Sequence, residues 1–213
     1  MEPKNNRKRR GRPIAVHARE EIIEAAISEF GRSGYANANM DAVAANAGVS
    51  KRTLYTRFDS KEALFQAVVE EAMMRISVSA ALDYAPSLSL HLQLKRYANA
   101  SVKLLRDPKH LNLFRVIVGE HMLNPALVEP GLGNYWKREY GFAAWIKDAI
   151  ADKRLVAADP VRASHLFASL MRGIMFWPAL LGRHHFESRN LNAAIDEAID
   201  VFLAYYATKK RKP

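Results

Sequence analysis

The sequence contains no cysteine among its 213 residues, and this absence removes a whole class of chemistry. Without thiols the chain cannot form disulfides, bind a metal through thiolates or use a cysteine nucleophile. It also has no apolar run of transmembrane length, and no apolar stretch of the kind found in signal peptides follows the basic residues 1–13. We therefore expect a cytoplasmic protein that has no membrane partner.

Enzyme motifs are also missing. Glu120-His121 lacks the second histidine of a metalloprotease helix, and His184-His185 lacks a clustered carboxylate. The chain has neither a glycine-rich phosphate loop nor a nucleophile elbow. We expect no catalytic residues, no metal and no cofactor.

Positive charge is concentrated at the two ends of the chain. The net charge is +10, of which residues 1–13 contribute +5 and residues 209–212 contribute +4, so the rest carries only +1. We interpret residues 209–212 as a solvated tail. Residues 10–13, Arg-Gly-Arg-Pro, are suited to a narrow minor groove, whose negative potential in A·T-rich DNA attracts arginines. We interpret residues 1–13 as a basic, disordered arm in which Arg10 and Arg12 contact DNA.

Residues 39–58 predict a helix, a tight turn and a second helix. Asn39 can cap the first helix, Gly48 can adopt the positive φ that ends it, and Ser50 can cap the second. The outer face of the second helix carries cations and hydroxyls, which can contact phosphates and base edges in a DNA groove. The expected DNA-binding residues here are Asn39, Ser50, Lys51, Arg52, Thr53, Tyr55 and, in the first turn of the following helix, Lys61.

The segment 18–69 resembles the DNA-binding domain of TetR-type (TetR/AcrR) transcriptional regulators. The matching residues are Phe30, Gly34-Tyr35, Ala44-x-x-Ala47-Gly48-Val49-Ser50, Thr53-Leu54-Tyr55, Phe58 and Ser60-Lys61-Glu62. Asn39 stands where the family often has threonine, and both residues can cap a helix. The resemblance implies an all-α fold of about nine helices, with a three-helix helix-turn-helix domain followed by a helical domain for effector binding and dimerisation.

The whole sequence lacks the alternation typical of strands and contains no internal repeat, and its apolar residues recur at helical spacing. Breaks are expected at Asp107-Pro108, Asn124-Pro125, Pro130 to Gly133, Asp159-Pro160 and 182–190, with a kink at Pro178. Outside residues 39–58, we expect helices at about 15–33, 60–82, 87–106, 110–123, 133–152, 160–182 and 190–207. The expected domains are the arm at 1–13, the helix-turn-helix domain at 14–60 and the effector-binding and dimerisation domain at 61–213.

All three tryptophans lie in the second domain, together with many phenylalanines and tyrosines. Each aromatic residue taken alone is ordinary core. Taken together, and with the resemblance, they indicate a cavity between helices for a small apolar or aromatic effector. The expected ligand-binding residues are Phe114, His121, Trp136, Tyr140 and Trp177.

Residues 163–177 are apolar on two sides, so this helix needs two packing partners. A two-fold bundle formed by the last two helices of each subunit would satisfy it, as the resemblance implies. The alternative is burial within one monomer. The expected interface residues are Phe167, Met171, Ile174, Ile199 and Phe202.

These expectations describe a homodimeric repressor. Its two recognition helices would lie in successive major grooves of a palindromic operator, about 34 Å apart, and an effector would release it. One alternative is an architectural DNA-binding protein that takes no ligand. A second alternative is an enzyme in the helical domain with DNA binding appended.

Overall fold

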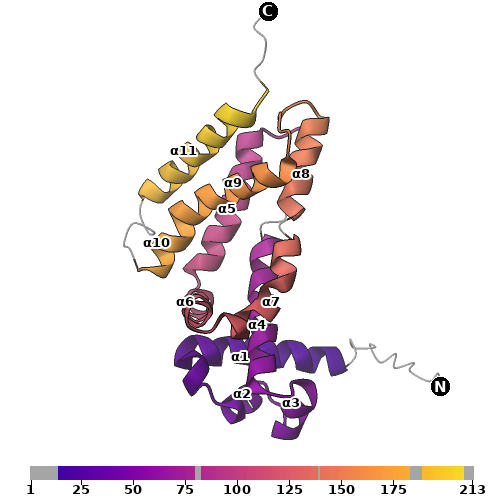
Figure 1. Ribbon diagram of the computed structural model, residues 1–213, viewed down its shortest axis with the longest axis vertical. Coiled ribbons are helices and arrows are strands. Elements are labelled where there is room, and N and C mark those ends of the chain that lie inside the picture. Colours follow the sequence, from indigo (N-terminus) through magenta and orange to yellow (C-terminus); the bar gives the residue numbers. More distant parts are fainter. Residues whose placement is uncertain (1–13, 80–82, 139, 183–188, 209–213) are drawn as a thin grey trace, which may run out of the picture.

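The computed structural model describes residues 14–79, 83–138, 140–182 and 189–208. Within these ranges the regular elements are helices, and a single bridge joins Leu155 to Ala207, which confirms the all-α prediction. The first three helices form one end of the molecule, and the last helix lies at the other (Figure 1). No helix in these ranges is both long enough and apolar enough to cross a membrane.

The first end consists of α1 (Ile14–Asn37), α2 (Met40–Asn46) and α3 (Lys51–Arg57). The apolar stripe of α1 is buried, and Ile22, Ile27 and Phe30 have no exposed surface. Gly34 has a φ of 74°, which bends α1 close to the end that the sequence predicts. The chain then turns into α2.

Three helices connect this end to the rest: α4 (Lys61–Ser79), α6 (Pro108–Leu123) and α7 (Pro125–Arg138). α1 packs against both α4 and α6, and α7 packs along α4. The break expected at Pro130 to Gly133 is wrong, because these residues lie inside α7. A Cβ on Gly131 would lie 2.6 Å from the Gln66 carbonyl oxygen, so α7 continues there in close contact with the backbone of α4.

The remaining helices are α5 (Leu90–Arg106), α8 (Tyr140–Ala151), α9 (Pro160–Met171), the π-helical turn η1 (Arg172–Phe176), α10 (Trp177–Leu180) and α11 (Arg189–Tyr206). α9, η1 and α10 together form the helix expected at 160–182, and the π-helical turn directly precedes Trp177-Pro178. The helix expected at 133–152 corresponds to the end of α7 and to α8, on either side of residue 139, which lies outside the described residues.

Two helices start at other residues than the sequence predicts, because their capping side chains lie at other positions. α5 begins at Leu90, where Ser89 accepts a hydrogen bond from the backbone amide of Leu92. α6 begins at Pro108, with Asp107 as its cap, and not at about residue 110. Asp107-Pro108, where the sequence predicts a break, is therefore the start of this helix.

A cluster of aromatic rings forms the core of the second part. The ring of Phe142 stacks on Trp145, with 5.4 Å between centroids, and on Phe167, with 5.1 Å. Phe202 of α11 meets the edge of Phe167. Gln93 is buried beside this cluster, where its Oε1 accepts hydrogen bonds from Trp145 Nε1 at 3.0 Å and from the Ala85 amide at 2.9 Å.

We predict that Gln93→Leu destabilises the fold by about 1–3 kcal/mol or more, because the buried Trp145 N–H and the half-buried Ala85 N–H lose their acceptor. Thermal unfolding followed by circular dichroism measures the loss as a lower melting temperature. Asn99→Leu, at an exposed position of the same helix, is the control. Equal melting temperatures for the two variants would contradict the role of Gln93.

Candidate nucleic-acid interface

The turn between α2 and α3 is built by the residues that the sequence predicts. Asn39 Oδ1 accepts a hydrogen bond from the Asp41 amide at 2.8 Å, and Ser50 Oγ accepts one from the Thr53 amide at 3.1 Å. Gly48 has a φ of 66°, in the left-handed region that favours glycine. These caps fix where each helix starts and ends.

The inner faces of α2 and α3 pack together, and the outer face of α3 is left exposed. Val43 and Leu54 are fully buried between the helices. The exposed side chains of α3 are those of Lys51, Arg52, Tyr55, Thr56 and Arg57. α3 lies at the end of the molecule remote from α11, so this face is open to a large partner (Figure 1).

Some polar groups of this face already have partners within the chain. Lys51 Nζ pairs with Asp41 Oδ1 at 2.7 Å, and this hydrogen bond raises the pKa of Lys51. The hydroxyls of Ser50 and Thr53 lie 2.8 Å apart, so they share a hydrogen bond. These side chains therefore form a polar network within the chain, with Arg52 exposed beside it.

Lys61 fixes the start of α4 against the end of α1. Its Nζ donates to the Ala36 carbonyl oxygen at 2.7 Å and lies 5.2 Å from the centroid of the Tyr35 ring. An ammonium group has three N–H donors, so this bond leaves capacity for a phosphate oxygen.

Glu29 is a structural residue of this region that the sequence analysis missed. Its carboxylate is buried, and Oε1 accepts hydrogen bonds from the Asn39 amide at 3.2 Å and from Ser33 Oγ at 3.2 Å. Burial opposes ionisation, but these bonds and that from Arg32 outweigh it and hold the pKa of Glu29 below its ordinary value. The sequence does hold a signal for its burial: Glu29 comes seven residues after Ile22, which places it on the apolar stripe of α1.

We predict that Glu29→Gln destabilises the protein by about 1–3 kcal/mol at neutral pH, because hydrogen bonds to a charged acceptor are lost. A pKa that is lowered by folding adds stability at pH values above 4.5, the ordinary pKa of glutamate. This added stability is lost as the pH falls through the pKa of the folded state. Urea unfolding of the wild type and of Glu29→Gln between pH 7 and pH 3 should therefore show a difference in the free energy of unfolding that narrows below about pH 4.5.

Glu21→Gln, at an exposed position of the same helix, is the control for that experiment. A stability difference between wild type and Glu29→Gln that stays constant across the pH range would show that the charge of Glu29 contributes nothing.

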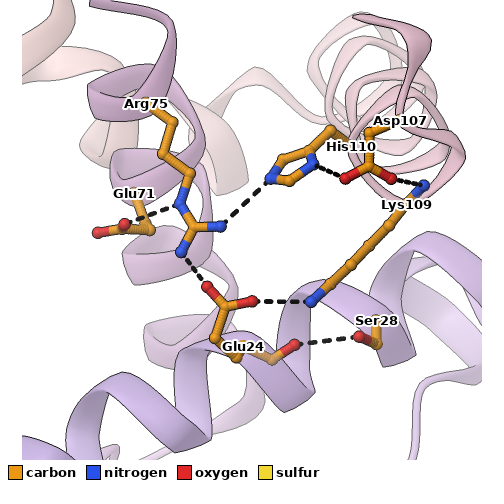
Figure 2. A network of polar contacts seen from close by, with 7 residues as sticks. All are labelled: Glu24, Ser28, Glu71, Arg75, Asp107, Lys109 and His110. Atoms are coloured by element: carbon orange, nitrogen blue, oxygen red, sulfur yellow. Dashed lines mark hydrogen bonds and ion pairs between the residues drawn. The ribbon is translucent and has the colours of Figure 1, made fainter. Parts of the chain in front are cut away.

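A polar network joins this end of the molecule to the second part, as Figure 2 shows. Glu24 of α1 accepts hydrogen bonds from Arg75 of α4 and from Lys109 Nζ of α6, the latter at 2.7 Å. Arg75 also donates to Glu71 Oε1 at 2.9 Å. Burial opposes ionisation of Glu24, but the bonds from Arg75 and Lys109 outweigh it and lower its pKa.

His110 extends the network along α6. Its Nδ1 lies 2.7 Å from Asp107 Oδ2, and its Nε2 lies 3.2 Å from a guanidinium nitrogen of Arg75. Since an arginine can only donate, the ring presents Nε2 as an acceptor and donates from Nδ1 to the carboxylate. Three helices are therefore held together by one continuous set of polar contacts (Figure 2).

A small apolar cavity of about 70 Å³ lies between α4, α5 and the α9–η1 segment. The described residues that line it are Ile76, Ser101, Leu104, Leu105, Met171, Arg172, Met175 and Phe176.

Of the predicted ligand-binding residues, Phe114, His121 and Trp177 are not in the described lining of this cavity. Phe114 is buried, and its ring contacts that of Phe176 with 6.1 Å between centroids. His121 is half-buried, and Trp177 is 47% exposed. The side chains of Trp136 and Tyr140 lie outside the described part of the structure, as do Arg10 and Arg12 of the arm.

Four of the five predicted interface residues belong to the core of the single chain. Phe167, Ile199 and Phe202 have no exposed surface, and Met171 lines the cavity, so their side chains are not available to a partner. Ile174 is half-buried. The apolar side chains that these helices and the turn after α10 do expose are Leu166, Trp177, Leu181, Val201 and Tyr205, at 44–78% of their surface.

Family models match both parts of the chain. A model described as "Bacterial regulatory proteins, tetR family" matches residues 22–68, and one described as "AefR-like transcriptional repressor, C-terminal domain" matches residues 92–208. The first match covers the helix-turn-helix helices, and the second covers α5 to α11 except for the first residues of α5.

Similar proteins are regulators. The HTH-type transcriptional repressor SCO4008 of Streptomyces coelicolor is 39% identical over 71 residues, which is 33% of this chain and 36% of that protein. The chain thus matches only about a third of that relative's length.

Solved structures match over nearly the whole chain. A TetR family transcriptional regulator from Pseudomonas syringae pv. tomato is 34% identical, with a TM-score of 0.68 over 90% of this chain and 97% of that one. The Flavonoid-responsive Regulator FrrA is 26% identical, with a TM-score of 0.69 over 91% of this chain and 99% of that one. These proteins belong to a class that regulates transcription without catalysis. The chain belongs to the TetR family of DNA-binding transcriptional regulators, and its similarity to the repressor SCO4008 agrees with this.

Proposed function

We propose that the protein is a homodimeric repressor that leaves a palindromic operator when a small apolar or aromatic effector binds its second domain. The observation that carries this proposal is the position of α4. Lys61, at its first turn, bonds to the end of α1 beside the helix-turn-helix, and Ile76, fifteen residues later, lines the apolar cavity. One helix therefore contacts both sites, and a ligand that moves it would change the position of α3.

The exposed face of α3 supports the DNA-binding part of the proposal. Arg52 and Thr53 would read base edges in the major groove, where an arginine can make two hydrogen bonds to guanine. Tyr55 and Lys61 would hold the phosphate backbone, together with the caps at Asn39 and Ser50 and with Lys51. Two copies of α3 would occupy successive grooves of one operator.

The exposed apolar side chains of α9 to α11 support the dimer. Leu166, Val201 and Tyr205 lie on helices that are already packed on their other side against the aromatic core. A two-fold contact between copies would remove this apolar surface from water. The name of FrrA, a flavonoid-responsive regulator, supports an aromatic effector by analogy.

We predict that Arg52→Ala weakens binding to the operator by about 1–3 kcal/mol and changes binding to random DNA much less, because a base contact is lost. Lys61→Gln should weaken both by similar factors and lower the salt dependence, because a phosphate contact is lost. Fluorescence anisotropy with an operator from the DNA beside the gene, and with a scrambled duplex, measures both.

Arg96→Ala, at an exposed position of α5, is the control for these two variants. If Arg52→Ala lost the same factor on both duplexes, Arg52 would touch only phosphates and the base-reading role would be wrong.

We predict that Arg75→Met uncouples the two domains. The variant loses the bonds from Arg75 to Glu24 and Glu71 but keeps the described lining of the cavity. A compound selected by its effect on tryptophan fluorescence should still bind, while its effect on operator affinity, about 5–150-fold in typical allosteric proteins, should shrink. Paired titrations of compound and operator measure both quantities.

Arg106→Met on α5 is the matched control, because it removes an exposed arginine from a helix that packs against α4. An unchanged effect of the compound on operator affinity in Arg75→Met would show that the signal does not pass through this network.

A further inference from the structure

A histidine completes the polar network that joins α1, α4 and α6 (Figure 2). The side chain of His110 is only 13% exposed, and both of its ring nitrogens have partners. Its Nδ1 lies 2.7 Å from Asp107 Oδ2, at the start of α6, and its Nε2 lies 3.2 Å from a guanidinium nitrogen of Arg75 on α4. Through this ring α6 contacts the side chain of Arg75.

The contact between His110 and Arg75 requires a neutral ring. A guanidinium has N–H donors and no acceptor, so Nε2 must offer its lone pair. A proton on Nε2 would remove that lone pair and bring two cations into contact. Histidine is the side chain that ordinarily changes charge between about pH 5 and pH 8. The link between α4 and α6 at this point is therefore sensitive to pH.

The neighbours of His110 keep their charges over the same range of pH. Burial opposes ionisation of Asp107, but the hydrogen bonds to His110 and to the Lys109 amide outweigh it and lower its pKa. Burial also opposes the charge of Arg75, but its bonds to Glu24 and Glu71 outweigh it and raise its pKa. The ring is therefore the part of this network in which a change of charge is expected.

The network can accept one more positive charge if Arg75 moves away from the ring. It contains more carboxylates than cations, namely Glu24, Glu71 and Asp107 against Arg75 and Lys109. A protonated His110 would balance this set and keep its bond to Asp107. Arg75 would lose the ring but keep its two other acceptors, Glu24 of α1 and Glu71 of α4.

We propose that His110 is a proton switch that releases Arg75 of α4 from α6. The neutral ring joins the two helices, and the protonated ring lets them separate at this point, while Lys109 still joins α6 to α1 through Glu24. The inference rests on the proposed function in one respect, since α4 must carry a movement to α3. Operator affinity then depends on pH in the absence of any effector.

The first test follows the full chain by NMR from pH 8 to pH 5.5. We expect Nε2 of His110 to gain a proton and the side-chain N–H signals of Arg75 to shift over the same pH range. The signals are assigned by their absence from His110→Gln and from Arg75→Met. A ring that stays neutral at pH 5.5, or Arg75 signals that do not move when the ring is protonated, would overturn the inference.

The second test measures operator affinity by fluorescence anisotropy over the same pH range, at constant ionic strength. Glutamine at position 110 offers an acceptor to Arg75 but cannot take up a proton. We therefore expect the wild-type affinity to change with pH by about fivefold or more beyond the change in His110→Gln, the lower end of typical allosteric couplings. His17→Gln, which removes an exposed histidine of α1, is the control and should keep the wild-type dependence.

Equal pH dependence in the wild type and in His110→Gln would overturn the inference even if Arg75 is released, because the switch would then not reach α3. If circular dichroism shows that His110→Gln does not fold, His110→Asn takes its place, since asparagine also cannot take up a proton. Failure of the proposed function is seen separately, at fixed pH. A protein that shows both pH responses but that no compound releases from its operator would keep the switch and lose the effector.

Discussion

The contact of α1 with both α4 and α6 is the constraint on which the rest of the structure depends. One face of α1 closes the helix-turn-helix core through Phe30, and another carries Glu24, which binds Arg75 and Lys109. Because the same helix serves both parts, the position of α3 is tied to the helices around the cavity. Any movement of α4 or α6 must either carry α1 along or break these ion pairs.

The charges of the molecule divide into two groups with different roles. The carboxylates of Glu24 and Glu29 lie partly or fully within the structure, where hydrogen bonds keep their pKa values low and hold helices in place. The arginines of α3 lie outside, with their side chains exposed. Acidic residues thus stabilise the DNA-binding end, and basic residues remain available to a polyanion.

What the sequence could predict follows from local rules. The caps at Asn39 and Ser50 and the positive φ of Gly48 depend on a few neighbouring atoms, so they were predicted correctly. Pro130 and Gly131 look like a break for the same local reason, but close packing against α4 keeps them helical. Phe167 and Phe202 lie on apolar faces, and periodicity alone cannot tell which face a second copy would cover. The cavity lining joins α4, α5 and η1, which only the folded chain brings together.

The close approach of α1 and α6 limits how freely such a protein can exchange parts. A Cβ on Gly31 would lie 3.3 Å from the Lys109 carbonyl oxygen, so the two backbones nearly touch there. The DNA-binding end is therefore not a detachable module, since cutting it out would expose the apolar surface of α1 that α6 covers. If this helix-turn-helix is joined to the second domain of another protein, that domain must contain a counterpart of α6 whose surface fits α1. Recombination in this fold, natural or engineered, is thereby restricted to partners that already have this close contact between α1 and α6.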